Sequence, residues 1–340
     1  MSILDILLTY NDLKDRWGSK MTTKILESEK SSESTVSWRT TTEADLVDCL
    51  RVQPRHSGDE LTGPEIAHQV WKRLLHHPAF VSAVFECTPP VLDHRIVGFG
   101  AAVFVSEKFA DQEIAHPKPG LNSRIIASVH KQRPVLLTAA EIAEAPQRFG
   151  VDVAVLYSSW LGTVLGPRQN AQVQTLLPHS LTKLLAGYRV HRLFGEAIGD
   201  EISFMRMSGV AKEIGTFPEL NLAINVVNSQ IALAQPASIA RLFFDHLEPV
   251  LQLSRSEQLL LLAAADGQTD SDLVRSLHLT MAAVKARWRS IFARFAQLKP
   301  DIAPEFNGEG NRGPQKRHRV LAYLREHPEE LRPFAPNSVD

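Results

Sequence analysis

Hydrophobic and polar positions along the chain follow two different periods. Apolar residues three or four positions apart predict helices over residues 44–52, 64–75 and 176–185. Runs rich in valine, isoleucine and phenylalanine predict strands over residues 80–87, 96–105, 151–156 and 193–198, the last followed by a helix through Met207. Because the two kinds of segment alternate between residues 37 and 231, we predict an α+β domain with a mixed sheet.

The first 36 residues have a different character. Residues 3–17 carry apolar side chains near helical spacing, whereas residues 24–35 are polar and rich in serine, glutamate and lysine. We predict a short N-terminal helix and a flexible linker. The helix would either dock on its own fold or act as a partner-binding arm.

Three helix starts follow from the sequence between Leu253 and Phe295. Ser254 precedes Glu257 by three residues and Thr269 precedes Asp272 by three, which is the capping-box pattern. Thr280 is a third N-cap candidate. These starts predict helices of roughly 12, 8 and 16 residues, the last two joined by a short turn. We therefore predict an all-α helix-turn-helix domain over residues 253–340, reached through a connector over residues 232–252.

The predicted third helix has two contrasting faces. An apolar stripe suited to the interior comprises Val284, Trp288, Ile291, Phe292 and Phe295. The opposite face presents Ala282, Lys285, Ala286 and Arg289. Small and cationic side chains allow a helix to approach the major groove of DNA closely and to reach bases or phosphates.

The charge distribution also indicates a polyanionic partner. The whole chain has a formal net charge of −1, yet residues 280–325 hold ten lysines and arginines against three carboxylates, a local charge of +7. Binding to phosphates requires such a local excess. A solvated helical surface without any partner is the alternative explanation.

The segment from Leu253 to Phe295 resembles the LuxR/GerE-type DNA-binding domain. The matching positions are Leu253, Glu257, Leu261, Ala265, Gly267, Leu273, Leu277, Thr280, Val284, Lys285 and Ile291. The family's Thr-Val-Lys is Ala283-Val284-Lys285 in this chain. The resemblance implies a recognition helix in the major groove, with Lys285, Ala286 and Arg289 facing the bases.

From these patterns we expect contacts to double-stranded DNA from two places. Lys285 and Arg289 would read bases, and Arg287 and Arg294 would contact phosphates. A basic cluster after a glycine-rich turn either clamps the phosphate backbone or forms the solvated rim of a further helix, predicted from Val320 to near Glu326. The expected contact residues are Thr280, Ala282, Lys285, Ala286, Arg287, Arg289, Arg294, Lys316, Arg317 and Arg319.

The element order between Ser37 and Phe217 resembles that of GNAT acetyltransferases. In that family a loop with closely spaced glycines, before the central helix, holds the pyrophosphate of acetyl-CoA on backbone N–H groups. The corresponding residues 162–171 lack this glycine spacing, and Pro167 removes one donor. We therefore expect no cofactor and no enzyme, but a domain that senses a small molecule or dimerises. An acyl-CoA-dependent acyltransferase targeted to DNA is the alternative.

Other chemistry receives little support from the sequence. The only cysteines are Cys49 and Cys87, and no metal-binding or nucleophile motif is present, so we expect neither a metal site nor catalytic residues. Glu86, Cys87, Tyr157 and Tyr188 would line a cleft only in the acyltransferase alternative. No apolar run is long enough to cross a bilayer, so we expect a cytoplasmic protein without membrane contact.

The resulting prediction is a transcription regulator that binds DNA as a homodimer, since two half-sites add their contacts. A protein-interaction role for the C-terminal helices is a further alternative, which the local charge of +7 disfavours.

Overall fold

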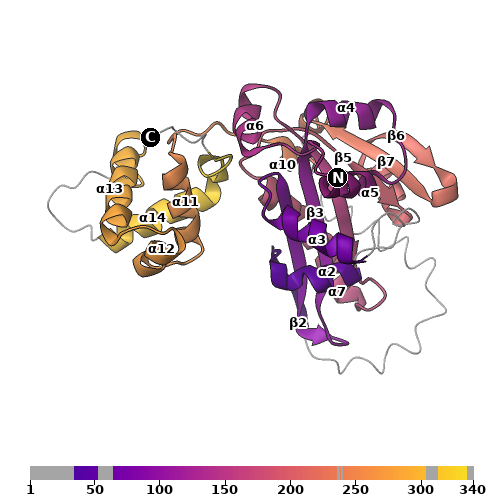
Figure 1. Cartoon of the computed structure of the whole chain (residues 1–340), viewed down its shortest axis with the longest axis horizontal. Helices are drawn as coiled ribbons and strands as arrows, with labels where there is room; N and C mark the ends of the chain where they lie inside the picture. Colours follow the sequence, from indigo (N-terminus) through magenta and orange to yellow (C-terminus); the bar gives the residue numbers. More distant parts are fainter. Residues whose placement is uncertain (1–33, 53–63, 236–237, 239, 304–312, 335–340) are drawn as a thin grey trace. The chain divides into compact units, whose positions relative to one another are not determined.

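The computed structural model describes residues 34–52, 64–235, 238, 240–303 and 313–334 (Figure 1). The predicted helix over residues 3–17 and nearly all of the linker over 24–35 lie outside the described residues. The chain divides into two compact units. The sheet unit takes the described residues within 1–136, 152–184 and 192–244, and the helical unit those within 137–151, 185–191 and 245–340.

The sheet has seven strands in the order β1-β2-β3-β4-β5-β7-β6. Their bounds are β1 (Thr35–Thr40), β2 (Phe80–Val91), β3 (His94–Val105), β4 (Val151–Trp160), β5 (Val190–Ile198), β6 (Lys212–Phe217) and β7 (Leu222–Asn228). Strands β1 to β4 pair antiparallel in sequence order, and β7 pairs antiparallel with both β5 and β6. The last strand of the chain thus lies between its two predecessors.

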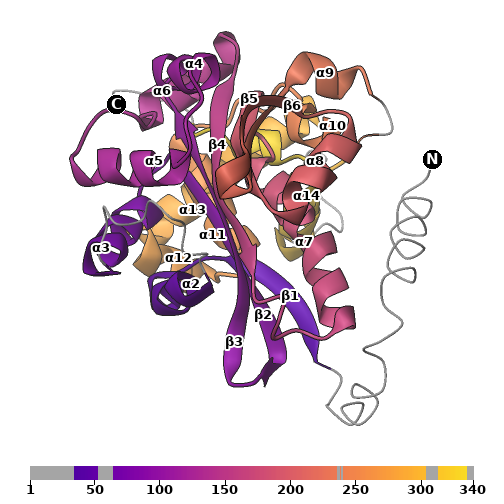
Figure 2. The same ribbon diagram turned by 90° about the vertical axis from the view of Figure 1, so that its right-hand side faces the viewer.

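Helices cover both faces of this sheet (Figure 2). One side carries α2 (Leu46–Val52), α3 (Pro64–Leu75), α4 (Glu107–Ala115) and α5 (Leu121–His130), and the other carries α7 (Pro167–Leu185) and α8 (Asp200–Ser208). Short elements complete the unit: η1 (Glu43–Asp45), η4 (Pro218–Leu220), α9 (Ser229–Leu233) and α10 (Arg241–Phe244).

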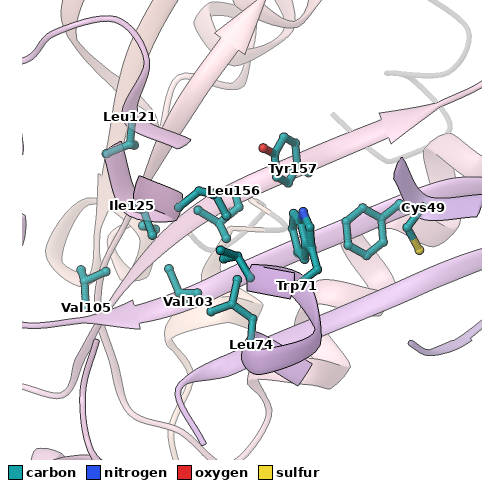
Figure 3. Close-up of a cluster of buried hydrophobic side chains, with 14 of the residues drawn as sticks. Cys49, Trp71, Leu74, Val103, Val105, Leu121, Ile125, Leu156 and Tyr157 are labelled. Atoms are coloured by element: carbon teal, nitrogen blue, oxygen red, sulfur yellow. The ribbon is translucent and has the colours of Figure 1, made fainter. Parts of the chain in front are cut away.

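The main core of the sheet unit lies under α2, α3 and α5 (Figure 3). Trp71 of α3 is 2% exposed, and its ring centre lies 5.2 Å from the centres of both the Phe99 and the Tyr157 rings. Such edge-on and tilted aromatic pairs add to the stabilisation that burial of apolar area provides. This aromatic cluster joins α3 to β3 and β4.

The helical unit contains the C-terminal helices. Its elements are α6 (Ala139–Glu144), η3 (Ala145–Gln147), α11 (Arg255–Ala265), α12 (Asp270–Ser276), α13 (Met281–Leu298), α14 (Gly313–Glu326) and η5 (Pro328–Glu330). Ser254, Thr269 and Thr280 are the N-caps of α11, α12 and α13, and the first two form complete capping boxes. All three predicted helix starts are confirmed.

Some predicted bounds were wrong. Helix α7 begins at Pro167, more than two turns before the expected start at Leu176, because proline at the first helical position needs no N–H partner. Helix α14 begins at Gly313, so the basic cluster lies on a helix and not ahead of one. It ends at Glu326, and Pro328 opens a separate 3-10 turn, as its missing N–H predicts.

Several elements were not predicted at all, namely β1, the three helices α4 to α6, and the β6–β7 pair. The coarser part of the expected class is confirmed, because an α+β domain with a mixed sheet is followed by a helical region. The assignment of that region as a helix-turn-helix domain stays a prediction. No helix in the described ranges combines the length and apolar character needed to span a membrane.

Candidate nucleic-acid interface

Helices α12 and α13 are joined by a tight turn. The Thr280 side chain accepts a hydrogen bond from the Ala283 N–H at 3.1 Å, and Leu279 N–H donates to the Val274 carbonyl at 3.0 Å. His278, in the turn between the two helices, has a left-handed backbone conformation with a φ of 52°. The turn therefore fixes the direction in which α13 leaves α12.

The apolar face of α13 points into the helical unit. Val284, Ile291 and Phe295 are fully buried, and Trp288 is 3% exposed. Phe292 is half-buried, and its ring stacks on that of Trp288 with the centres 5.4 Å apart. The expectation that Trp288 belongs to the core is confirmed.

The opposite face of α13 is open to solvent. Its exposed stripe consists of Ala282, Lys285, Ala286, Arg289 and Ala293. These positions recur at intervals of three and four residues, so they lie on one side of the helix. Thr280, at the start of the helix, is exposed as well.

No carboxylate lies anywhere along α13, whose sequence holds one lysine and three arginines. Within the part of the chain that the structure describes, the side chains of Lys285, Arg287 and Arg289 have no hydrogen bond or ion pair. Lys285 and Arg289 are exposed and Arg287 is half-buried. These three cations are therefore available to an external anion.

Arg294, which was expected on a phosphate, is used inside the unit. Its guanidinium donates to the carbonyls of Leu251 and Gln252 at 3.2 and 3.1 Å and lies 3.6 Å from the Glu257 carboxylate. The arginine thus ties α13 to the chain that enters α11.

The rotation of α13 about its axis is fixed by a buried carboxylate. Glu257, 4% exposed, accepts the Ser254 N–H at 2.8 Å and the Ser290 hydroxyl at 2.7 Å. Because Ser290 neighbours Arg289, this contact holds the cationic stripe outward. The sequence signalled the capping role of Glu257 but not its bond to Ser290.

The three cations of the predicted basic cluster, Lys316, Arg317 and Arg319, have different environments. Arg317 pairs with Asp270 at 2.9 Å and stacks over Trp288, so it too is used internally. Arg319 is exposed and has no ion pair or hydrogen bond in the described ranges, whereas Lys316 is half-buried and interacts within the protein. Arg319 is the member of the cluster best placed for a phosphate.

In the sheet unit, the loop between β4 and α7 is held by hydrogen bonds within the loop and by hydrogen bonds to Asn170, which lies in the first turn of α7. The Asn170 amide donates to the carbonyls of Gly162 and Leu165, both at 3.0 Å, and accepts the Trp160 indole N–H at 3.0 Å. The N–H groups of residues 162, 164 and 165 donate to backbone carbonyls, and Pro167 has none to offer. These three N–H groups are therefore not free to hold the pyrophosphate of acetyl-CoA. Nothing in the sequence singled out Asn170.

Strand β4 contains a bulge beside this loop. Ala101 of β3 pairs with Tyr157 and Ala102 pairs with Val155, which leaves Leu156 as the extra residue. The buried Asn122 side chain donates to the Leu156 carbonyl. On β5, Glu196 accepts the N–H groups of Gly120 and Leu121 at 2.6 and 3.0 Å. These polar contacts hold the start of α5 against the middle of the sheet.

The residues considered for an acyltransferase cleft do not form one cluster. Cys87 packs in the apolar cluster with Phe85 and Val173, and Tyr157 packs against Trp71. Glu86 is engaged by Arg39 at 2.7 Å, while Tyr188 belongs to the helical unit. Burial raises the pKa of the Tyr188 hydroxyl, as it does that of the Cys87 thiol. A raised pKa favours the neutral form, so neither the Tyr188 hydroxyl nor the Cys87 thiol ionises readily near neutral pH.

No family model matches the chain, and no curated protein matches it. Solved structures similar to part of it include FeeM, an N-acyl amino acid synthase from uncultured soil microbes, at 10% identity over 62% of this chain and 99% of that chain, with a TM-score of 0.33. The C-terminal condensation domain of Ebony, in complex with beta-alanyl-dopamine, is similar at 10% identity over 57% and 99% of the two chains, with a TM-score of 0.35.

Arabidopsis thaliana NAA60, in complex with a bisubstrate analogue, is similar at 11% identity over 57% of this chain and 96% of that chain, with a TM-score of 0.33. Likenesses this distant carry no information about substrate, activity or partners.

Proposed function

We propose that the helical unit binds double-stranded DNA by placing α13 in the major groove, and that the chain is a transcription regulator. The observation that carries this proposal is the exposed stripe of α13. It combines Lys285 and Arg289, which have no ion pair within the described residues, with three alanines on a helix without a carboxylate. A bare, positively charged helix can enter a groove about 12 Å wide.

The internal contacts of the unit support the same function. Glu257 and Arg294 fix the rotation of α13, and Arg317 covers Trp288, so the stripe is presented on a rigid support. A site built on packed elements positions its side chains better than one on a loop. Arg287 and Arg319 would add phosphate contacts, and two copies of the chain would add half-sites.

The test is a mobility shift of full-length protein on genomic fragments at several salt concentrations. Lys285→Ala and Arg289→Ala should each weaken binding and reduce fragment preference, because both side chains lie on the stripe. Lys108→Ala, which removes an exposed cation from α4 of the sheet unit, is the charge-matched control and should bind like the wild type. Equal binding by all four proteins would contradict the proposal.

A second candidate function is acyl transfer from an acyl-CoA by the sheet unit. It is favoured by the GNAT-like strand order and by the bulge at Leu156, and it is opposed by the loop that Asn170 closes. Thermal melting with and without acetyl-CoA separates the cases. A dose-dependent rise in melting temperature would favour the enzyme, and its absence would favour a sensing or dimerising domain.

A further inference from the structure

We infer that α13 selects guanines, at two neighbouring positions, and not adenine or cytosine. This inference deepens the proposed DNA binding and rests on it. It starts from the side chains that the exposed stripe offers to a base edge. Those are the cations of Lys285 and Arg289 and the methyl groups of Ala282, Ala286 and Ala293.

Hydrogen-bond acceptors are missing from that stripe. Helix α13 contains no aspartate, glutamate or asparagine, and the hydroxyl of Ser290 points toward the buried carboxylate of Glu257 and not toward the stripe. Its one glutamine, Gln297, lies eight positions beyond Arg289, or about 12 Å along the axis at about 1.5 Å per residue. In its central turns the stripe therefore offers bases only donors and methyl groups.

The major groove distinguishes bases by donors and acceptors. Guanine presents two acceptors, O6 and N7, which arginine or lysine can reach. Adenine and cytosine each present an amino group that requires an acceptor on the protein, usually an amide or a carboxylate. A stripe limited to donors satisfies guanine, and it leaves the amino groups of adenine and cytosine unpaired.

Spacing along the helix sets the distance between the two guanines. Lys285 and Arg289 are four residues apart on one face, which is about 6 Å along the axis. Helices in the major groove follow the groove, and their residues three or four positions apart contact successive bases, so the two side chains address neighbouring base pairs. The alanine methyls on either side suit the C5-methyl group of thymine, which needs only an apolar contact.

The experiment is selection of binding sites from a pool of duplexes with a randomised core, using the full-length protein. We expect the recovered sites to share two guanines with this spacing. Arg289→Ala should lose the preference at one of them and Lys285→Ala at the other. Arg319→Ala is the matched control and should weaken all sequences alike, because a phosphate contact carries no base preference.

A single-atom probe gives the decisive comparison. Replacing the selected guanine by 7-deazaguanine removes N7 and leaves base pairing intact. At the position read by Arg289 we expect a loss in affinity of about 10-fold for the wild type and little change for Arg289→Ala.

Sites with adenine or cytosine at these positions would overturn the inference, as would salt-sensitive binding without base preference, and either result would leave DNA binding standing. No binding to any duplex at low salt would overturn both the inference and the proposed function.

Discussion

The guanidinium carbon of Arg317 lies 4.3 Å from the centre of the Trp288 ring. Arg317 belongs to α14 and Trp288 to the buried face of α13, and the same guanidinium donates to Asp270 at the start of α12 at 2.9 Å. One side chain thus joins three helices. A cation expected on DNA contributes instead to the packing that holds α13.

Replacing Arg317 should loosen the helical unit. Arg317→Ala loses both the stacking on Trp288 and the pairing with Asp270, and we expect a cost of about 1–2 kcal/mol. Arg317→Lys keeps the charge but not the planar stacking, so its cost should be intermediate. Hydrogen exchange of the α13 amides in the full chain measures the effect. Unchanged protection in Arg317→Ala would show that the stacking contributes nothing to stability.

Arg319 should behave in the opposite way. Its side chain is exposed, so Arg319→Ala should leave hydrogen exchange unchanged. If Arg319 contacts a phosphate, the slope of log affinity against log salt should decrease by about 1. Arg317→Ala provides the comparison, since its internal pairing predicts the wild-type slope. The reverse pattern in the two variants would contradict these assignments.

A buried ion-pair network should stabilise the edge of the sheet. Asp45, 1% exposed at its side chain, is held by Arg39 at 2.6 Å and by Arg95 at 3.0 Å. Asp45→Asn removes the charge, while Arg39 and Arg95 are partly exposed and keep their pairing with Glu86, so the expected cost is about 2 kcal/mol. Urea unfolding of the full chain, followed at α2 and β1 by hydrogen exchange, measures this cost. Arg51→Ala, which breaks an exposed pair with Asp48, is the control and should cost little.

The same carboxylate predicts an acid dependence. Burial alone would raise the pKa of Asp45, but hydrogen bonds from Arg39, Thr42 and Arg95 lower that pKa well below its ordinary value of 3.8. Its stabilising contribution is therefore complete above pH 3.8 and is lost as the pH falls further. The unfolding free energy should decline more steeply with acid in the wild type than in Asp45→Asn. Parallel curves would exclude this role of Asp45.

His246 predicts a different pH response in the helical unit. Its side chain is 8% exposed, neither ring nitrogen has a hydrogen-bond partner among the described residues, and the nearest carboxylate oxygen, of Glu248, is 3.9 Å away. Burial lowers the pKa of His246 below its ordinary 6.5. The unfolded chain therefore binds the proton more readily, and stability should fall as the pH drops below 6.5.

His246→Phe tests this directly. A neutral aromatic ring of similar size should be tolerated at pH 7.5, and it should remove most of the loss in stability between pH 7 and pH 5. Thermal melting across this range measures the difference. His278→Gln, at an exposed turn residue, should follow the wild-type curve.

Local chemistry in the sequence was enough to determine the helical framework. An N-cap acts within three residues, so Ser254, Thr269 and Thr280 set the starts of α11, α12 and α13 without help from distant contacts. The apolar period of α13 likewise determined which face is buried, because a helix with one apolar stripe has only one face to hide.

Only the tertiary structure decided which cations remain available. Arg294 and Arg317 look like Lys285 and Arg289 in the sequence, yet their partners lie 42 and 47 positions away, at Gln252 and Asp270. The positions of α7 and β7 also depend on residues distant in the sequence. Helix α7 is bound to β1 by a hydrogen bond from the Val36 N–H to the Gln172 side chain. Strand β7 lies between β5 and β6 in the sheet. Pairing across such separations depends on how the elements pack, and no local period encodes it.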